Sequence, residues 1–360
     1  MAMKVTIRNQ RQIIVPIRFT RAVTGSPLAD APEVDDRGFE PGTRPPSWGH
    51  SQYRGAMVGI TQGDTVRVKV LREDIDAGAP LTVTSTDPKI ASIEDPPSGA
   101  LLGADGIFKI KGVADVRNKP VKIQVRLGGT GGPVLGELEP HIFELKSLKI
   151  RIHLVTINGI STARTAASMI PVVQEINRIW RPAGIEFDYD PALTLQENIN
   201  GLAVAGQMTT NLAASSFAEF SSIINLHPDA NRINIYCVNT ANEVFGLTFA
   251  NDVSRAQGGY GIVVTDSSSP NSNAHELCHY LDNPEHSTEN AARAGVRQDF
   301  WARRRLLSTP NPYPNSVPAF RNDVGYGAQT RGPQISIKDL AGDPWDGEEA
   351  RARVRARTPF

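Results

Sequence analysis

The sequence predicts a multidomain protein in which an all-β sandwich precedes an α/β (α+β) domain with a mixed sheet. Its length of 360 residues is enough for two domains of ordinary size. Residues 57–146 hold short alternating runs of apolar and polar residues between turn-forming residues, which is typical of a sandwich. Residues 147–307 instead combine strand-like runs with apolar residues at helical spacing. The remaining segments are 1–56, with one or two strands and a long irregular loop, and 308–360, a loop-rich extension.

Composition narrows the classes of partner. Lys plus Arg and Asp plus Glu both number 38, so the formal net charge is zero, and we expect no nucleic-acid partner. No apolar run is long enough to span a membrane. The first eleven residues carry charges with no apolar segment behind them, so we expect no conventional signal peptide. The protein is therefore expected to be cytoplasmic or exported by a route that needs no such signal.

The chain has two cysteines, Cys237 and Cys278. Two cysteines in a chain of this length do not make a disulfide framework. We expect two buried free thiols, and a single bridge between them is the alternative.

In the sandwich region, apolar residues recur at every second position. Val66, Val68 and Val70 alternate with Arg67 and Lys69, which predicts a strand with one buried face. Similar runs, separated by Pro- and Gly-containing turns, follow along the chain as far as residue 127. Their regular spacing favours an antiparallel sandwich.

After residue 147 the pattern predicts strands alternating with helices. A strand at 148–155 precedes a helix at 162–181. Pro171 is best placed in the first turn of this helix, and Gly184 ends it. The Ala- and Ser-rich stretch up to about residue 230 predicts another helix. Further strands are expected at 185–189, 233–237, 245–249 and 260–264.

Residues 275–279 read His-Glu-Leu-Cys-His. On a helix, His275 and His279 project from the same face, so their imidazoles can bind one Zn²⁺ ion. Glu276 lies beside them and is the expected general base for a metal-bound water. Asn273 is the expected N-cap of this helix, because Glu276 follows three residues later as in a capping box.

A catalytic zinc normally has three protein ligands and an open position for water. The third ligand must come from beyond the helix, which Pro284 should end near Asn283. Glu285 and His286 follow at once, and a tight turn can bring either back to the metal. We expect His286 to bind because imidazole suits zinc, with Glu285 as the alternative.

The segment from Ala274 to Ser287 resembles the metzincin zinc metallopeptidases, whose pattern is His-Glu-x-x-His-x-x-Gly-x-x-His or Asp. The predicted order of elements is also similar to theirs: strand, helix, strand, strand, edge strand, strand, active-site helix. The resemblance implies a zincin-type endopeptidase in which Glu276 activates a zinc-bound water and then passes the proton to the leaving amine. It also implies that a protein or peptide substrate adds as a further strand along the edge strand formed by Gly246, Leu247, Thr248, Phe249 and Ala250.

The sequence departs from the metzincin pattern in three places. Asp282 replaces the glycine that ends the helix, and Glu285 stands where the family has its third ligand. No methionine follows Met208, so the methionine turn that supports the site in this family is missing. These departures motivate the alternative of a weakly active or inactive zincin, which would act as a zinc-stabilised binding module or a secreted effector or toxin component.

The stretch Leu81–Ile93 resembles bacterial immunoglobulin-like domains. This resemblance implies an accessory sandwich with no chemistry of its own. Its expected role is that of an accessory or targeting module with a docking partner of its own.

Overall fold

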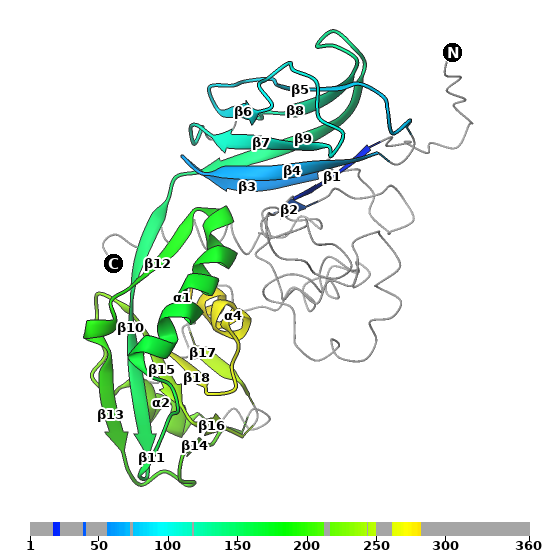
Figure 1. Cartoon of the computed structure of the whole chain (residues 1–360). Helices are drawn as coiled ribbons and strands as arrows, with labels where there is room; N and C mark the ends of the chain where they lie inside the picture. The colour runs from blue at the N-terminus through cyan, green and yellow to red at the C-terminus, as the bar shows by residue number, and fades with distance from the viewer. Residues whose placement is uncertain are drawn as a thin grey trace. The chain divides into compact units, whose positions relative to one another are not determined.

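The computed structural model in Figure 1 consists mostly of β-strands with few helices, arranged in several sheets. It describes residues 17–21, 39–40, 56–72, 75–116, 119–211, 217–242, 244–249 and 261–281. This content agrees with the predicted mixture of strands and helices. The chain divides into two compact units, and the boundary lies between Glu144 and Leu145. Most of the predicted loop in 1–56 and all of the extension 308–360 lie outside the described residues.

The first unit contains two sheets. In one, the strand order is β1 (Ile17–Arg21), β4 (Thr65–Arg72), β7 (Ile107–Gly112) and β6 (Ala91–Asp95). In the other, it is β2 (Phe39–Glu40), β3 (Ala56–Thr61), β9 (Val134–Phe143), β8 (Ile123–Leu127) and β5 (Leu81–Ser85). The described pairs are antiparallel except β3 with β9, which is parallel, so the expectation of a purely antiparallel arrangement is wrong at this pair.

The two sheets share one hydrophobic core. Val66, Val68 and Val70 of β4 are buried, as their alternation with charged residues predicts. Phe108 of β7 is fully buried in the same cluster, which also includes Ile123 of β8 from the other sheet. Strands β4 and β7 therefore turn alternate apolar side chains inward, which is the pattern that a pair of packed sheets requires.

The second unit is built on one mixed sheet. Its central strand is β10 (Lys146–Ile157), which pairs with β15 (Ile233–Val238) on one side and with β12 (Ile185–Tyr189) and β13 (Leu195–Ile199) on the other, all in parallel. The sheet continues from β15 to β18 (Gly261–Thr265) and ends at β17 (Gly246–Phe249), the antiparallel edge strand. Short strands complete this unit: β11 (Ile160–Ser161), β14 (Gln207–Met208) and β16 (Thr240–Ala241).

Helix α1 (Ala166–Trp180) follows the first strand of this sheet. Thr165 caps it, because its hydroxyl accepts a hydrogen bond from the backbone N–H of Ser168. This cap starts the helix at Ala166, so Pro171 lies in the second turn and its predicted place in the first turn is wrong. A 3₁₀ turn, η1 (Arg181–Ala183), follows, and Gly184 ends it with φ 71°, as the sequence predicts.

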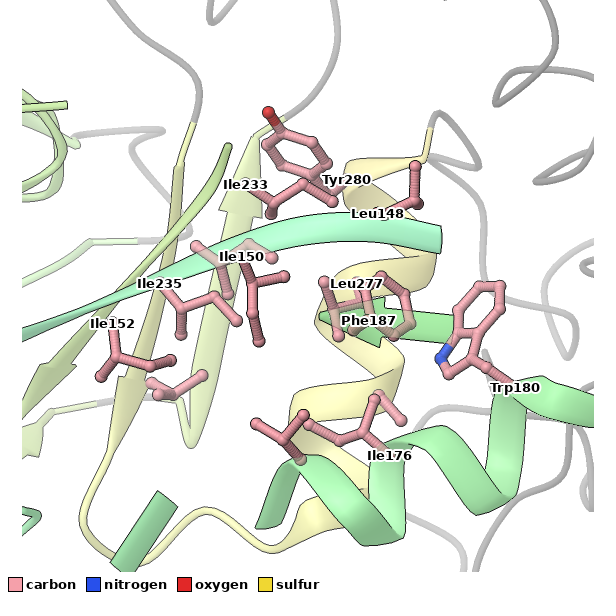
Figure 2. Packing of buried hydrophobic residues seen from close by; sticks show 14 of the residues in the cluster. Leu148, Ile150, Ile152, Ile176, Trp180, Phe187, Ile233, Ile235, Leu277 and Tyr280 are labelled. Atoms are coloured by element: carbon pink, nitrogen blue, oxygen red, sulfur yellow. The ribbon is translucent and has the colours of Figure 1, made fainter. Parts of the chain in front are cut away.

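Helices cover both faces of the sheet. Ile235 of β15 packs with α1 and α4 (Pro270–Tyr280), whereas its neighbour Tyr236 packs with α2 (Ala218–Ile224) on the opposite face. Figure 2 shows Ile176 of α1 and Leu277 of α4 among the side chains of the strands, in the core on the face of the sheet that α1 and α4 cover. One further 3₁₀ turn is η2 (Pro191–Leu193). Among the described helices, none is long and apolar enough to cross a membrane.

Candidate catalytic and metal site

The His-Glu-x-x-His motif lies entirely within α4. The predicted helix is therefore confirmed, and positions 275 and 279 stand one helical turn apart along it. His275 is half-buried. The side chain of His279 lies outside the described residues.

Helix α4 begins earlier than the sequence analysis placed it. Pro270 is its first residue, so Asn273 lies within the first turn and its prediction as the N-cap is wrong. The cap is made by Ser269, whose Oγ accepts a hydrogen bond of 3.1 Å from the backbone N–H of Ser272. A proline suits the first helical position because the N–H it lacks would have no partner there.

The carboxylate of Glu276 is buried against the edge strand β17. Only 7% of this residue is exposed. The hydroxyl of Thr248 lies 2.7 Å from Oε2 of Glu276 and donates a hydrogen bond to it. A Cβ on Gly246 would lie 2.7 Å from Cγ of Glu276, so the strand can approach this closely only because residue 246 is glycine. Two residues of β17 thus fix the position of the carboxylate.

Some backbone N–H and C=O groups of β17 point away from β18, toward the open edge of the sheet. The backbone N–H of Thr265 donates to the carbonyl of Phe245, at 3.0 Å. Bonded and non-bonded pairs alternate in an antiparallel ladder, so Gly246 and Thr248 occupy non-bonded positions opposite β18. Their N–H and C=O groups point toward the other side of β17, where none of the described strands pairs with it.

The predicted substrate strand is therefore only partly described. Leu247 occupies a bonded position opposite Val263, so its main chain faces β18. The backbone of Phe249 belongs to β17, but its side chain lies outside the described residues, as does all of Ala250.

Two charged residues tie the turn before α4 to the turn before α1. The guanidinium of Arg164 donates to the carbonyl of Ser268 at 2.6 Å. The carboxylate of Asp266 accepts hydrogen bonds from the backbone N–H of Ala163 at 2.8 Å and from the side-chain amide of Asn239 at 3.0 Å. These contacts, which sequence reasoning missed, hold the start of the motif helix in place. Arg164 and Asp266 are 102 positions apart, and no sequence pattern pairs them.

The rest of the predicted zinc-ligand set lies outside the described residues. This holds for Glu285 and His286. Among the described side chains there is no group of three His, Cys, Asp or Glu suited to a metal ion. Of the predicted ligands, the described part of the chain includes the side chain of His275, a half-buried imidazole of the kind that zinc binds.

A buried polar cluster, which the sequence does not predict, lies on the mixed sheet of the second unit. His153 of β10 is fully buried, and its Nδ1 shares a hydrogen bond of 3.0 Å with Oε1 of Glu197. Its Nε2 lies 3.1 Å from Oδ1 of Asn234. Oε2 of the same glutamate lies 2.8 Å from Nδ1 of His227. Each of these polar atoms has a partner, so the cluster can be accommodated in an apolar interior.

Cys237 of β15 is a free, buried thiol, as predicted, which argues against a bridge to Cys278. Burial raises the pKa of the Cys237 thiol to about 12 because the interior disfavours the thiolate. The side chain of Cys278 lies outside the described residues.

No family model matches this chain, and no curated protein matches its sequence. The contacts of α4 and β17 are therefore the evidence on the chemistry of this site.

Proposed function

We propose that this protein is a zinc-dependent endopeptidase. In this proposal His275, His279 and His286, or Glu285 in place of His286, hold the zinc ion, and Glu276 is the general base. One observation carries the proposal: the His-Glu-x-x-His motif occupies a helix that places the buried carboxylate of Glu276 against the edge strand of a sheet.

Bound zinc would supply Lewis-acid activation of a water molecule and of the scissile carbonyl. Glu276 accepts a proton from the attacking water on its carboxylate and passes that proton to the leaving amine. The hydroxyl of Thr248 orients the carboxylate by its hydrogen bond to Oε2. Burial of Glu276 keeps bulk water from competing for that hydrogen bond.

The substrate class follows from β17. The outward-facing main-chain groups of Gly246 and Thr248 can pair with a peptide in an extended conformation, which would add a strand to the sheet. Because these two residues also contact Glu276, a peptide bound there would run past the base. We therefore assign an extended peptide or a locally unfolded protein segment as the substrate.

The order of elements supports a zincin-type domain. Along the chain, β10, α1, β12, β15, β17, β18 and α4 follow the order that the metzincin resemblance implies, with β17 as the antiparallel edge strand. In the first unit, two sheets around one core are compatible with an immunoglobulin-like accessory module that docks a partner. We propose that role for it.

The test is to measure metal content and proteolysis together. Purified wild-type protein should hold one zinc per chain and cleave denatured casein. Glu276→Gln should keep the zinc and lose cleavage by about a hundredfold or more, since it removes the proton acceptor. Glu175→Gln on the surface of α1, where the carboxylate pairs with Arg178 at 3.0 Å, is the matched control and should cleave normally.

Two results would count against this function. Undiminished cleavage by Glu276→Gln would exclude the mechanism. Wild-type protein that holds zinc but cleaves nothing would favour the alternative of a zinc-stabilised binding module or effector component.

A further inference from the structure

Thr248 makes two different kinds of contact from one position on β17. Its side-chain hydroxyl donates to Oε2 of Glu276 at 2.7 Å, and it also lies 3.1 Å from the backbone carbonyl of the same residue. Its main-chain N–H and C=O occupy a non-bonded position opposite Ile262 of β18 and face the other side of the strand. The same residue therefore joins the edge of the sheet to the carboxylate of the proposed base.

We propose that Thr248 is a positioning residue that couples the binding of an extended peptide along β17 to the orientation of the Glu276 carboxylate. The inference rests on the proposed function. A peptide that pairs with the main chain of Thr248 fixes that part of the strand, and fixing the strand fixes the hydroxyl that holds Glu276.

The geometry around the carboxylate explains why the hydroxyl matters. On one side the carboxylate lies close to the backbone of Gly246, where an added Cβ would be 2.9 Å from Oε1. Thr248 holds the other carboxylate oxygen, and its β-branched side chain has few rotamers on a strand. Loss of the hydroxyl would leave Oε2 without this donor while the shape of the strand is preserved.

The proposal also predicts where the effect appears in the kinetics. Contacts that the peptide makes with β17 are used to orient the base, so they contribute in the transition state more than in the ground state. Removal of the hydroxyl should therefore lower kcat and leave KM nearly unchanged. A residue that only binds substrate would change KM instead.

The experiment compares three variants of the full chain. Thr248→Val removes the hydroxyl and keeps the shape, and Thr248→Ser restores the hydroxyl. Thr156→Val is the matched control, because Thr156 is also a half-buried strand threonine, but its hydroxyl lies 2.8 Å from Oγ of Ser161. Substrates are denatured casein and a synthetic peptide that spans its main cleavage site. Zinc content is measured for every variant.

We expect Thr248→Val to lower kcat by about tenfold or more with zinc content and KM preserved, since a hydrogen bond to a charged group is lost. Thr248→Ser and Thr156→Val should stay close to the wild type. A kcat for Thr248→Val equal to that of the wild type would overturn the inference and leave the proposed function intact. Equal impairment of Thr248→Ser and Thr248→Val would also overturn it, because the hydroxyl would then be irrelevant.

A second measurement does not depend on turnover. The side-chain carboxyl carbon resonance of Glu276, assigned by its absence in Glu276→Gln, should shift in Thr248→Val and return toward the wild-type position in Thr248→Ser. An unchanged resonance in Thr248→Val would refute the contact between Thr248 and Glu276, whether or not the protein cleaves casein. Failure of the wild type to cleave refutes the proposed function and the coupling to kcat.

Discussion

Glu276 of α4 packs directly on Gly246 of β17. A Cβ built on this glycine would lie 2.7 Å from Cγ and 3.0 Å from Cδ of Glu276, closer than real Cβ contacts come. Thr248, two residues along the strand, holds the same carboxylate by a hydrogen bond. Gly246 is thus needed for the close approach of two elements, and its role is to leave room for Glu276.

Gly246→Ala should therefore displace the base without removing any functional group. We expect cleavage of casein to fall by about a hundredfold, because displacement of a catalytic group by about an ångström has an effect of that size. Zinc content should not change. Gly129→Ala is the control, since nothing lies within 4 Å of a Cβ at that glycine. A Gly246→Ala variant that cleaves like the wild type would show that Glu276 has another position from which it can act.

Strands β4 and β15 were predicted from two simple patterns of apolar residues. In β4 the valines are buried and the charged residues between them are not, and in β15 every residue is buried. Strand β13 was missed because its sequence is Leu-Gln-Glu-Asn-Ile, with a glutamate at its centre. Glu197 is 3% exposed, and its buried partner His153, which shares a hydrogen bond with it, lies 44 positions away. No local pattern of hydrophobicity contains that partner.

The candidate site also has a part that the sequence predicts and a part that it does not. The spacing of His275, Glu276 and His279 is local, so one stretch of sequence was enough to predict the helix and its chemistry. The contact between Glu276 and Thr248 spans 28 positions and depends on how α4 packs against β17. The start of α4 differs from the sequence prediction because Ser269 and Pro270, which make the cap and the first helical position, belong to a polar stretch that offers several capping residues.

The third zinc ligand can be assigned by two single variants. His286→Ala should weaken zinc binding by about a hundredfold or more, since loss of a ligand costs at least as much as loss of a group that orients one. Glu285→Ala should change it little. Competition with a chelator of known zinc affinity measures both. The opposite ranking would assign Glu285 as the ligand, and equal weak effects would mean that the ligand comes from another part of the chain.

The Cys237 thiol should be inert in the folded protein. Its pKa is raised to about 12 by burial, so the reactive thiolate is scarce near neutral pH. In Cys278→Ser, where Cys237 is the one remaining cysteine, a thiol-reactive dye should label the protein slowly at about pH 8 and rapidly in urea. Fast labelling without urea would show that β15 opens easily.

The same pKa shift predicts a dependence of stability on pH. In the unfolded chain the Cys237 thiol ionises at about pH 8.5, whereas in the folded protein it stays neutral until about pH 12. The stabilisation is fully present below the unfolded pKa and is lost as pH rises through that window, at up to about 1.4 kcal/mol per pH unit. Urea unfolding of wild type and Cys237→Ala between about pH 8 and pH 10 measures it. The two proteins should lose stability in parallel if the shift is absent.

The buried cluster around His153 should contribute mainly to stability. His153→Leu leaves the carboxylate of Glu197, which is 3% exposed, with one hydrogen-bonding partner fewer in an apolar interior. We expect the free energy of unfolding to fall by about 3–5 kcal/mol, the usual effect of breaking a buried pair from one side. His227→Ala, whose side chain is 79% exposed, should cost about 1 kcal/mol or less.

Removal of both partners separates the cost of an unpaired carboxylate from the value of the pair. In His153→Leu with Glu197→Leu, no buried charge is left, so much of the stability lost in the single variant should return. Unfolding in urea, followed by circular dichroism, gives the free energies of unfolding of the wild type, His153→Leu, Glu197→Leu and the double variant. If the double variant loses as much free energy of unfolding as the two single variants together, His153 and Glu197 are not energetically coupled, and the charge-burial explanation is wrong.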